Sequence, residues 1–136
     1  MISMTVEFLL DTNILSDIIR NPRGTGATEL GRRRKVTAMS IVVAAEVRYG
    51  LQKNPGYRYA DRAAALLNVV PIIPLEQPAD VHYSELRALL SGKGTPLGPN
   101  DYWIAAHALA LDCTLVTANE GEFRRVPGLR VENWLT

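Results

Sequence analysis

The chain has 136 residues, 47% of them hydrophobic and 21% charged, which predicts a single globular domain over residues 1–136 and excludes a disordered or fibrous chain. Its net charge of +1 does not by itself indicate a nucleic-acid-binding protein. The single cysteine, Cys113, excludes an intrachain disulfide, and the chain shows neither signal-peptide regions at its start nor the roughly 20-residue apolar run of a membrane-spanning helix, so we expect a cytoplasmic protein.

Strands and helices are predicted to alternate through the first half of the chain. The apolar run around Leu9 predicts a buried strand, and Thr12 or Asn13 is suited to cap the helix that follows. Ser40 is suited to cap a later helix. In chain order we expect a strand over 6–10, helices over 14–20 and 25–34, a strand over 36–39, and helices over 41–53 and 57–68.

The second half continues the same alternation. Pro71 and Pro74 limit residues 69–75 to a short strand at best. Asn100 is suited to cap a helix after a Gly/Pro-rich loop at 92–99. The other expected elements are helices over 78–91 and 101–111 and strands over 114–117 and 131–134. Because strands alternate with helices, we expect an α/β fold with a mostly parallel sheet.

Asp11 follows the first predicted strand directly. Ligands bind outside the carboxyl ends of the strands in an open parallel sheet, so a carboxylate there can point into a binding crevice. Asp11 can equally be a plain cap of the next helix.

Glu46 is the most unusual acidic residue of the chain. Val42, Val43 and Tyr49 lie three or four positions away, so Glu46 stands on an apolar stripe of its helix. A buried carboxylate is costly unless it is paired or bound to a metal. The alternatives are a salt bridge to an arginine or a helix edge that faces solvent.

Asp101 opens a helix, where the macrodipole favours an ionised carboxylate of the kind that a hard cation needs. In that position it can also be purely stabilising. The last long strand leads into Asn119 and Glu122, which are candidates for a fourth site residue. All these groups are oxygen donors, as Mg²⁺ and Mn²⁺ prefer. His82, His107 and Cys113 show no zinc-ligand spacing.

Basic residues gather between positions 18 and 60, a stretch that contains nine lysines and arginines but only two acidic residues. This distribution is compatible with a phosphate-binding face, and also with a solvated helix surface. The candidates for steering an RNA backbone are Arg32, Arg33, Arg34, Lys35 and Arg48.

Four segments, in order along the chain, resemble the motifs of VapC-type PIN domains. They are LDTNIL at 10–15, EVRYG at 46–50, GPNDYWIAAHA at 98–108, and the C-terminal segment at 115–123 and 126–134. Ordered motifs with matched spacing are far more specific than any one motif alone.

The resemblance implies a three-layer α/β/α domain and a crevice where Asp11, Glu46 and Asp101 bind Mg²⁺ or Mn²⁺. It implies metal-assisted RNA hydrolysis by the toxin of a toxin–antitoxin pair, with a VapB-like antitoxin as partner and a homodimeric assembly. Residues expected to orient water around the ion are Thr12, Asn13 and Thr117. Many PIN domains carry an aspartate near Asn119, so here the fourth carboxylate is either absent or supplied by Glu122.

Two other classes of protein remain as alternatives. A PIN-like module can bind RNA or protein without cutting, although the presence of all three acids disfavours it. A phosphoryl-transfer fold also uses a strand-end aspartate, but such phosphatases typically carry Asp-x-Asp where this chain has Asp11-Thr12-Asn13. A phosphorelay receiver would need a lysine after a late strand, and none follows Lys93.

Overall fold

The computed structural model describes residues 4–135 and contains a five-stranded sheet in the order β3-β2-β1-β4-β5. Every neighbouring pair of strands is parallel. The strands are β1 (Phe8–Leu10), β2 (Thr37–Ser40), β3 (Ile72–Ile73), β4 (Thr114–Val116) and β5 (Arg130–Glu132). The expected α/β class with a short parallel sheet is confirmed.

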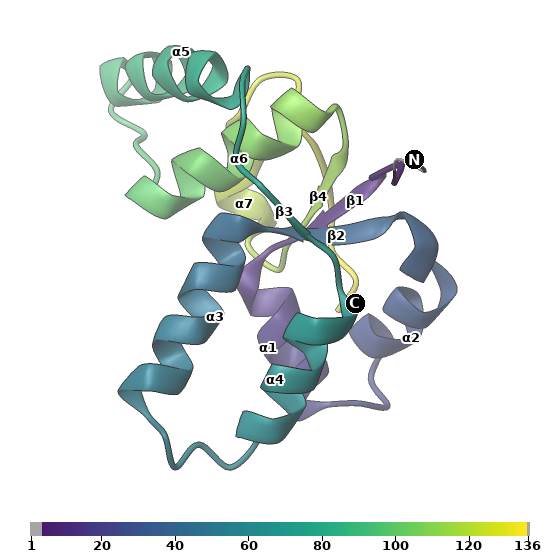
Figure 1. The fold of residues 1–136 in the computed structure, drawn as a ribbon. Coiled ribbons are helices and arrows are strands. Elements are labelled where there is room, and N and C mark those ends of the chain that lie inside the picture. Colours follow the sequence, from purple (N-terminus) through teal and green to yellow (C-terminus); the bar gives the residue numbers. More distant parts are fainter. Residues whose placement is uncertain (1–3, 136) are drawn as a thin grey trace.

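Helices cover both faces of this sheet. Figure 1 shows α1, α3 and α4 gathered on one side, and α5, α6 and α7 on the other. The helical elements are α1 (Thr12–Arg20), α2 (Thr25–Arg32), the 3₁₀ turn η1 (Arg34–Val36), α3 (Ile41–Lys53), α4 (Ala60–Val69), α5 (Ala79–Gly92), α6 (Pro99–Leu111) and α7 (Glu120–Phe123). None of the helices within residues 4–135 has the length and apolarity that crossing a bilayer requires. The arrangement is a three-layer α/β/α sandwich.

The core lies along the three central strands, which are covered on both faces and therefore apolar at consecutive positions. Their fully buried side chains are Leu9, Leu10, Ala38, Met39, Leu115 and Val116. The chain returns from β3 to β4 across the sheet, so the order of strands reverses beside β1. In open parallel sheets this switch point, at the carboxyl ends of the strands, is where a ligand crevice forms. Asp11 and Thr117 follow the paired ends of β1 and β4 there.

Two predicted helix caps are wrong. The N-cap of α1 is Asp11, whose side chain accepts a hydrogen bond from the Thr12 backbone, so neither Thr12 nor Asn13 is the cap. The N-cap of α6 is Gly98, and Asn100 lies inside the first turn. Proline is favoured at the first helical position because it needs no N–H partner there, so Pro99 starts α6 earlier than expected.

Other boundaries shift by a few residues, as frayed ends usually do. The short helix α7 was not predicted, because four residues carry too little periodicity to detect. Ser40 caps α3 as expected, with its hydroxyl accepting from the Val42 backbone at 3.1 Å. The differing elements are β1 and β5, which are shorter than expected, α4, which begins at Ala60, and residues 34–36, which form η1.

Candidate active site

The carboxyl ends of β1 and β4 open into a surface hollow of about 420 Å³, the carboxylate hollow. It takes side chains from α1, α3 and α6 and from the segment after β4. Its lining residues are Asp11, Thr12, Asn13, Ser16, Arg20, Glu46, Asp101 and Asn119. The three acids that the sequence singles out, far apart along the chain, therefore reach one hollow.

Asp11 is buried at the floor of the hollow, with 4% of its surface exposed. Its Oδ1 accepts from the Thr12 backbone at 2.8 Å, and its Oδ2 accepts from the Thr117 hydroxyl at 2.8 Å and the Asn13 amide at 3.3 Å. Burial raises the pKa of Asp11, while the hydrogen bonds of Thr117, Thr12 and Asn13 oppose that rise. Asp11 is therefore both a helix cap and a lining carboxylate.

Glu46 projects from the middle of α3 and is half-buried. Its Oε1 accepts from the Thr12 hydroxyl at 3.0 Å. Burial raises the pKa of Glu46, and so does the charge of Asp11, while hydrogen bonds from Thr12 and Asn100 lower it. Within the described residues no lysine, arginine or histidine pairs with Glu46, so the salt-bridge alternative has no support.

Asp101 lies in the first turn of α6. Burial raises its pKa to about 6, and the charges of Asp11, Glu122 and Glu46 add to the rise. The expectation that the helix dipole keeps Asp101 ionised more readily is wrong, because desolvation and carboxylate repulsion outweigh the dipole. The repulsion also shows that these acids lie close enough to influence one another.

Asn119 and Glu122 form a pair at the rim of the hollow. Asn119 lines the hollow, and its side-chain amide donates to Glu122 Oε2 at 2.9 Å. Glu122 does not line the hollow itself, but its charge contributes to the raised pKa of Asp101. Asn119 is thus the nearer candidate for a fourth site residue, with Glu122 one hydrogen bond behind it.

Thr12, Asn13 and Thr117 hold the carboxylates in place. The hydroxyls of Thr12 and Thr117 each donate to a carboxylate of the hollow, as described for Glu46 and Asp11. The side-chain Oδ1 of Asn13 accepts a hydrogen bond from the Ala118 backbone N–H at 3.0 Å, which connects α1 to the segment after β4. These contacts fix the acids through neutral donors and leave their negative charge uncompensated.

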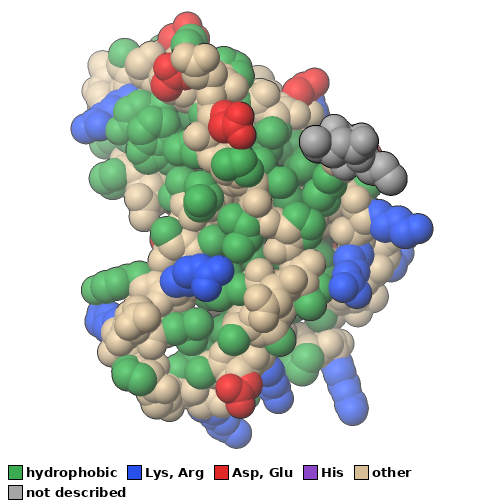
Figure 2. All heavy atoms as spheres, in the orientation of Figure 1, with side chains coloured by type: hydrophobic (Ala, Val, Ile, Leu, Met, Phe, Trp, Pro, Cys, Tyr) green, Lys and Arg blue, Asp and Glu red, His purple; other side chains and the backbone are tan. Residues whose placement is uncertain are grey.

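The basic segment Arg32, Arg33, Arg34 and Lys35 is not brought to the hollow. It precedes β2, whereas the hollow lies beyond the end of that strand, and four strand residues span roughly 13 Å. Arg48 is two positions after Glu46, which places it roughly 200° around α3. On the face shown in Figure 2, lysine and arginine side chains are dispersed and form no single patch. This placement does not favour RNA steering by these residues at the carboxylates.

Arg20 is the basic side chain that does line the hollow, and reasoning from the sequence missed it. Thr12, Ser16 and Arg20 are spaced four apart on α1, so they share one face of the helix. That spacing, counted from Thr12 onward, is the signal in the sequence that could have found Arg20.

The donor set fits a hard divalent cation. It consists of carboxylate and amide oxygens, and carboxylates that repel one another gain from a cation placed between them. Within residues 4–135, however, no three acidic, histidine or cysteine side chains are already arranged so as to hold a metal ion. Coordination would therefore require rotation of side chains such as those of Glu46 and Asp101.

His107 and Cys113 are core residues. His107 Nδ1 lies 2.8 Å from the hydroxyl of Ser40, which joins α6 to the start of α3, and burial lowers the His107 pKa. Burial raises the pKa of the Cys113 thiol to about 11, so it is a poor nucleophile. His107 thus connects the two helices that carry Asp101 and Glu46.

Comparisons with known proteins agree with this geometry. A sequence profile of the PIN domain family matches residues 8–129. The chain is 37% identical over 130 residues to Ribonuclease VapC2 of Rickettsia felis, covering 93% of this chain and 97% of the relative. It is 31% identical to the tRNA(fMet)-specific endonuclease VapC of Salmonella typhimurium, covering 95% and 98%. The crystal structure of VapBC2 from Rickettsia felis bound to a promoter DNA fragment aligns with a TM-score of 0.86 at 35% identity, covering 95% of this chain and 99% of that chain.

Proposed function

Because the chain belongs to the PIN domain family, as one of its VapC ribonucleases, we propose that it hydrolyses RNA phosphodiester bonds with a divalent cation held by Asp11, Glu46 and Asp101. The observation that carries the proposal is the convergence of these three carboxylates, without a basic partner among the described residues, on one hollow at the switch point of the sheet. Mg²⁺ or Mn²⁺ suits such oxygen donors.

Several residues in and beside the hollow have a part in this reaction. A cation bound by the three carboxylates supplies Lewis-acid chemistry at the phosphate. Thr12 and Thr117 hold Glu46 and Asp11 toward the hollow through the hydrogen bonds described above. Asn119 lines the rim of the hollow, which supports a role in orienting the attacking water. Water attacks phosphorus in line, which leaves a 5′-phosphate and a 3′-hydroxyl, and no covalent intermediate with the protein is needed.

We also infer the biological setting. Similar solved structures are VapBC toxin–antitoxin complexes, which supports the role of a toxin in a type II pair with a VapB-like antitoxin as partner. A homodimer in the cytoplasm is the expected form of the free toxin. The RNA is a single-stranded loop or end, because unpaired bases can be read by a shallow protein site.

Cleavage of a labelled RNA by the purified protein tests the proposal. Activity should require added Mg²⁺ or Mn²⁺, should vanish with a chelator, and should vanish in Asp101→Asn. Asp80→Asn is the matched control, because Asp80 is the acidic residue in the first turn of α5 as Asp101 is in α6, but it lies outside the hollow. Full activity in Asp101→Asn would contradict a ligand role for Asp101. RNA binding without any cleavage by the metal-loaded protein would favour a non-catalytic binding module.

A further inference from the structure

We propose that Arg20 binds the phosphodiester next to the one that is cut, so that the RNA strand leaves the carboxylate hollow along α1 toward the turn between α1 and α2. The inference rests on the proposed function, and it assigns a substrate-binding residue and a direction to the substrate. The hollow is lined by three carboxylates and by one basic side chain, Arg20, which forms no ion pair with any of them within the described residues.

The position of Arg20 on α1 supports contact with a neighbouring phosphate rather than the scissile one. Thr12, Ser16 and Arg20 form a stripe on one face of α1, and all three line the carboxylate hollow. Thr12 and Arg20 are eight residues apart, which is roughly 12 Å along a helix. The Thr12 end of the stripe contacts Glu46 through the Thr12 hydroxyl, so the Arg20 end is displaced from that contact along the axis of α1.

Arg20 is also available for a ligand. It is exposed, and within the described residues it forms no ion pair with any carboxylate, although three acids line the same hollow. The guanidinium therefore does not neutralise the protein's own acids, and its planar donors suit a phosphate.

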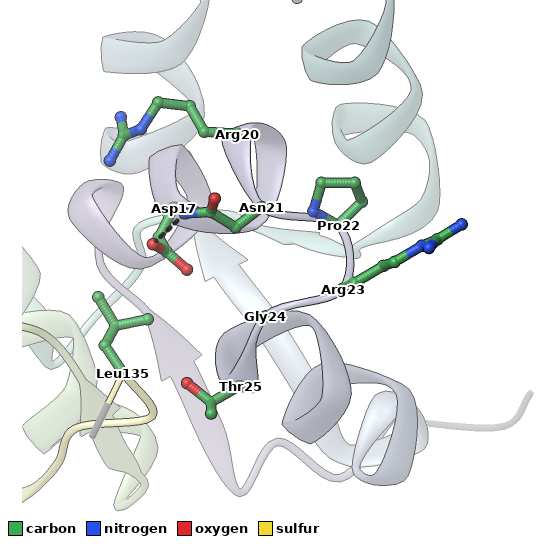
Figure 3. Close-up of a pocket in the computed structure, with 8 residues that line it drawn as sticks. All are labelled: Asp17, Arg20, Asn21, Pro22, Arg23, Gly24, Thr25 and Leu135. Atoms are coloured by element: carbon green, nitrogen blue, oxygen red, sulfur yellow. Dashed lines mark hydrogen bonds between the residues drawn. The ribbon is translucent and has the colours of Figure 1, made fainter.

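Arg20 also lines a second hollow, which lies at the turn between α1 and α2. This turn hollow, of about 500 Å³, is lined by residues 17, 20–25 and 135, so Arg20 lies on the boundary between the two hollows. Figure 3 shows Arg20 and Arg23 on the turn hollow, directed away from one another. Asp17, the acid of this hollow, already accepts from the Asn21 amide at 2.8 Å. The turn hollow thus offers space and positive charge for the nucleotide that follows the neighbouring phosphate.

The plain alternative is that Arg20 stabilises α1. It is the basic residue in the last turn of that helix, where a positive charge interacts favourably with the dipole. The chain offers a matched control for this role. Lys53 is the basic residue in the last turn of α3, is exposed, forms no ion pair within the described residues, and lines neither hollow.

The test compares Arg20→Gln with Lys53→Gln in cleavage of a labelled single-stranded RNA, over a range of RNA and salt concentrations. We expect Arg20→Gln to raise KM about tenfold or more, the scale of a lost charged hydrogen bond, with kcat little changed. The slope of log affinity against log salt should fall by about 0.7, the value for one phosphate contact on a single strand. Lys53→Gln should keep the wild-type KM and slope, and both variants should lose a similar, small amount of melting temperature.

The inference is wrong if the two variants share the wild-type KM and salt slope, because Arg20 then serves only its helix. It is also wrong if Arg20→Gln lowers kcat at unchanged KM, which would place Arg20 at the reacting phosphate. RNA binding is measured in parallel for Asp101→Asn with and without Arg20→Gln, which needs no cleavage. A wild-type protein that cuts no RNA refutes the proposed function, whereas this binding comparison still decides the role of Arg20.

Discussion

The acids at the carboxyl ends of the strands and the arginine before β2 differ in their partners. Among residues 4–135 the acids have no basic partner, whereas the arginine has carboxylate and aromatic partners. At the carboxyl ends of the strands, Asp11, Glu46 and Asp101 have raised pKa values, and neutral hydroxyl and amide donors hold Asp11 and Glu46. Before the amino end of β2, Arg33 pairs with Glu29 at 3.2 Å and with Glu132, the last residue of β5, at 3.0 Å. Its guanidinium also lies over the rings of Phe8 and Trp134.

Whether a charged residue has a partner of opposite charge distinguishes structural from functional residues better than the charge composition does. In the basic segment, Arg32 and Arg33 have carboxylate partners within the fold. The acidic end keeps like charges together at a cost in stability, and carboxylates with such raised pKa values are typical of sites that bind or react. A run of four basic residues is the more conspicuous feature of the sequence, but the separated acids carry the candidate chemistry.

The largest expected effect is the loss of activity in Asp11→Asn. Asparagine can still cap α1, so the helix should remain intact while the buried negative charge is lost. We expect cleavage to fall by at least the order of 10²–10³-fold that a key transition-state contact contributes. Initial rates under saturating Mg²⁺, with a circular dichroism spectrum as the control for folding, measure this. A variant with more than a tenth of wild-type activity would contradict a ligand role for Asp11.

Glu46→Gln should separate activity from stability. Glutamine can accept the same hydrogen bond from Thr12, but it removes a half-buried charge that Asp11 repels. We therefore expect activity to be lost while the metal-free protein unfolds at an equal or higher temperature. Thermal unfolding without added metal is the measurement. A large loss of stability would instead indicate that Glu46 has a structural partner.

The pH dependence of stability has a defined sign. The pKa of Asp101 is raised from 3.8 to about 6 in the fold, so between these values the folded state binds more protons than the unfolded state. The free energy of unfolding should therefore fall as pH rises from about 4 through about 6, and Asp101→Asn should flatten this part of the profile. Denaturant unfolding without metal across that range tests the sign, and a rise in stability over the same window would contradict it.

A smaller effect is expected at the basic end. Arg33→Gln removes two ion pairs and two cation–π contacts, which should cost about 1 kcal/mol of unfolding free energy. Its KM for RNA should stay at the wild-type value, because Arg33 does not line the carboxylate hollow. A raised KM with unchanged stability would restore the RNA-steering role that the sequence suggested for residues 32–35.

The sequence predicted the part of the site that depends on topology. Residues directly after parallel strands meet at one edge of the sheet, so the strand pattern alone is enough to place Asp11 and Thr117 together. Glu46 could be identified because its charge contradicts the apolar face around it. The α/β fold followed from alternating strands and helices, and the resemblance to PIN domains added the spatial grouping of the three acids.

What could not be predicted depends on the direction of side chains in three dimensions. Arg20 belongs to the hollow only because one face of α1 turns toward α3 and α6, and the basic segment is excluded because it precedes β2 rather than following it. The raised pKa of Asp101 needs the depth of burial and the positions of three other acids. Each of these features depends on residues that are far apart in the sequence.

Titration with Mn²⁺ by isothermal calorimetry, at a pH above 6, tests the shared cation site most directly. The wild type and Asp80→Asn should bind the ion with the same affinity, and Asp11→Asn, Glu46→Gln and Asp101→Asn should each lose that binding. If any of the three variants keeps wild-type affinity while folded, that carboxylate does not belong to a common site, and the account of the hollow as a single metal centre is wrong.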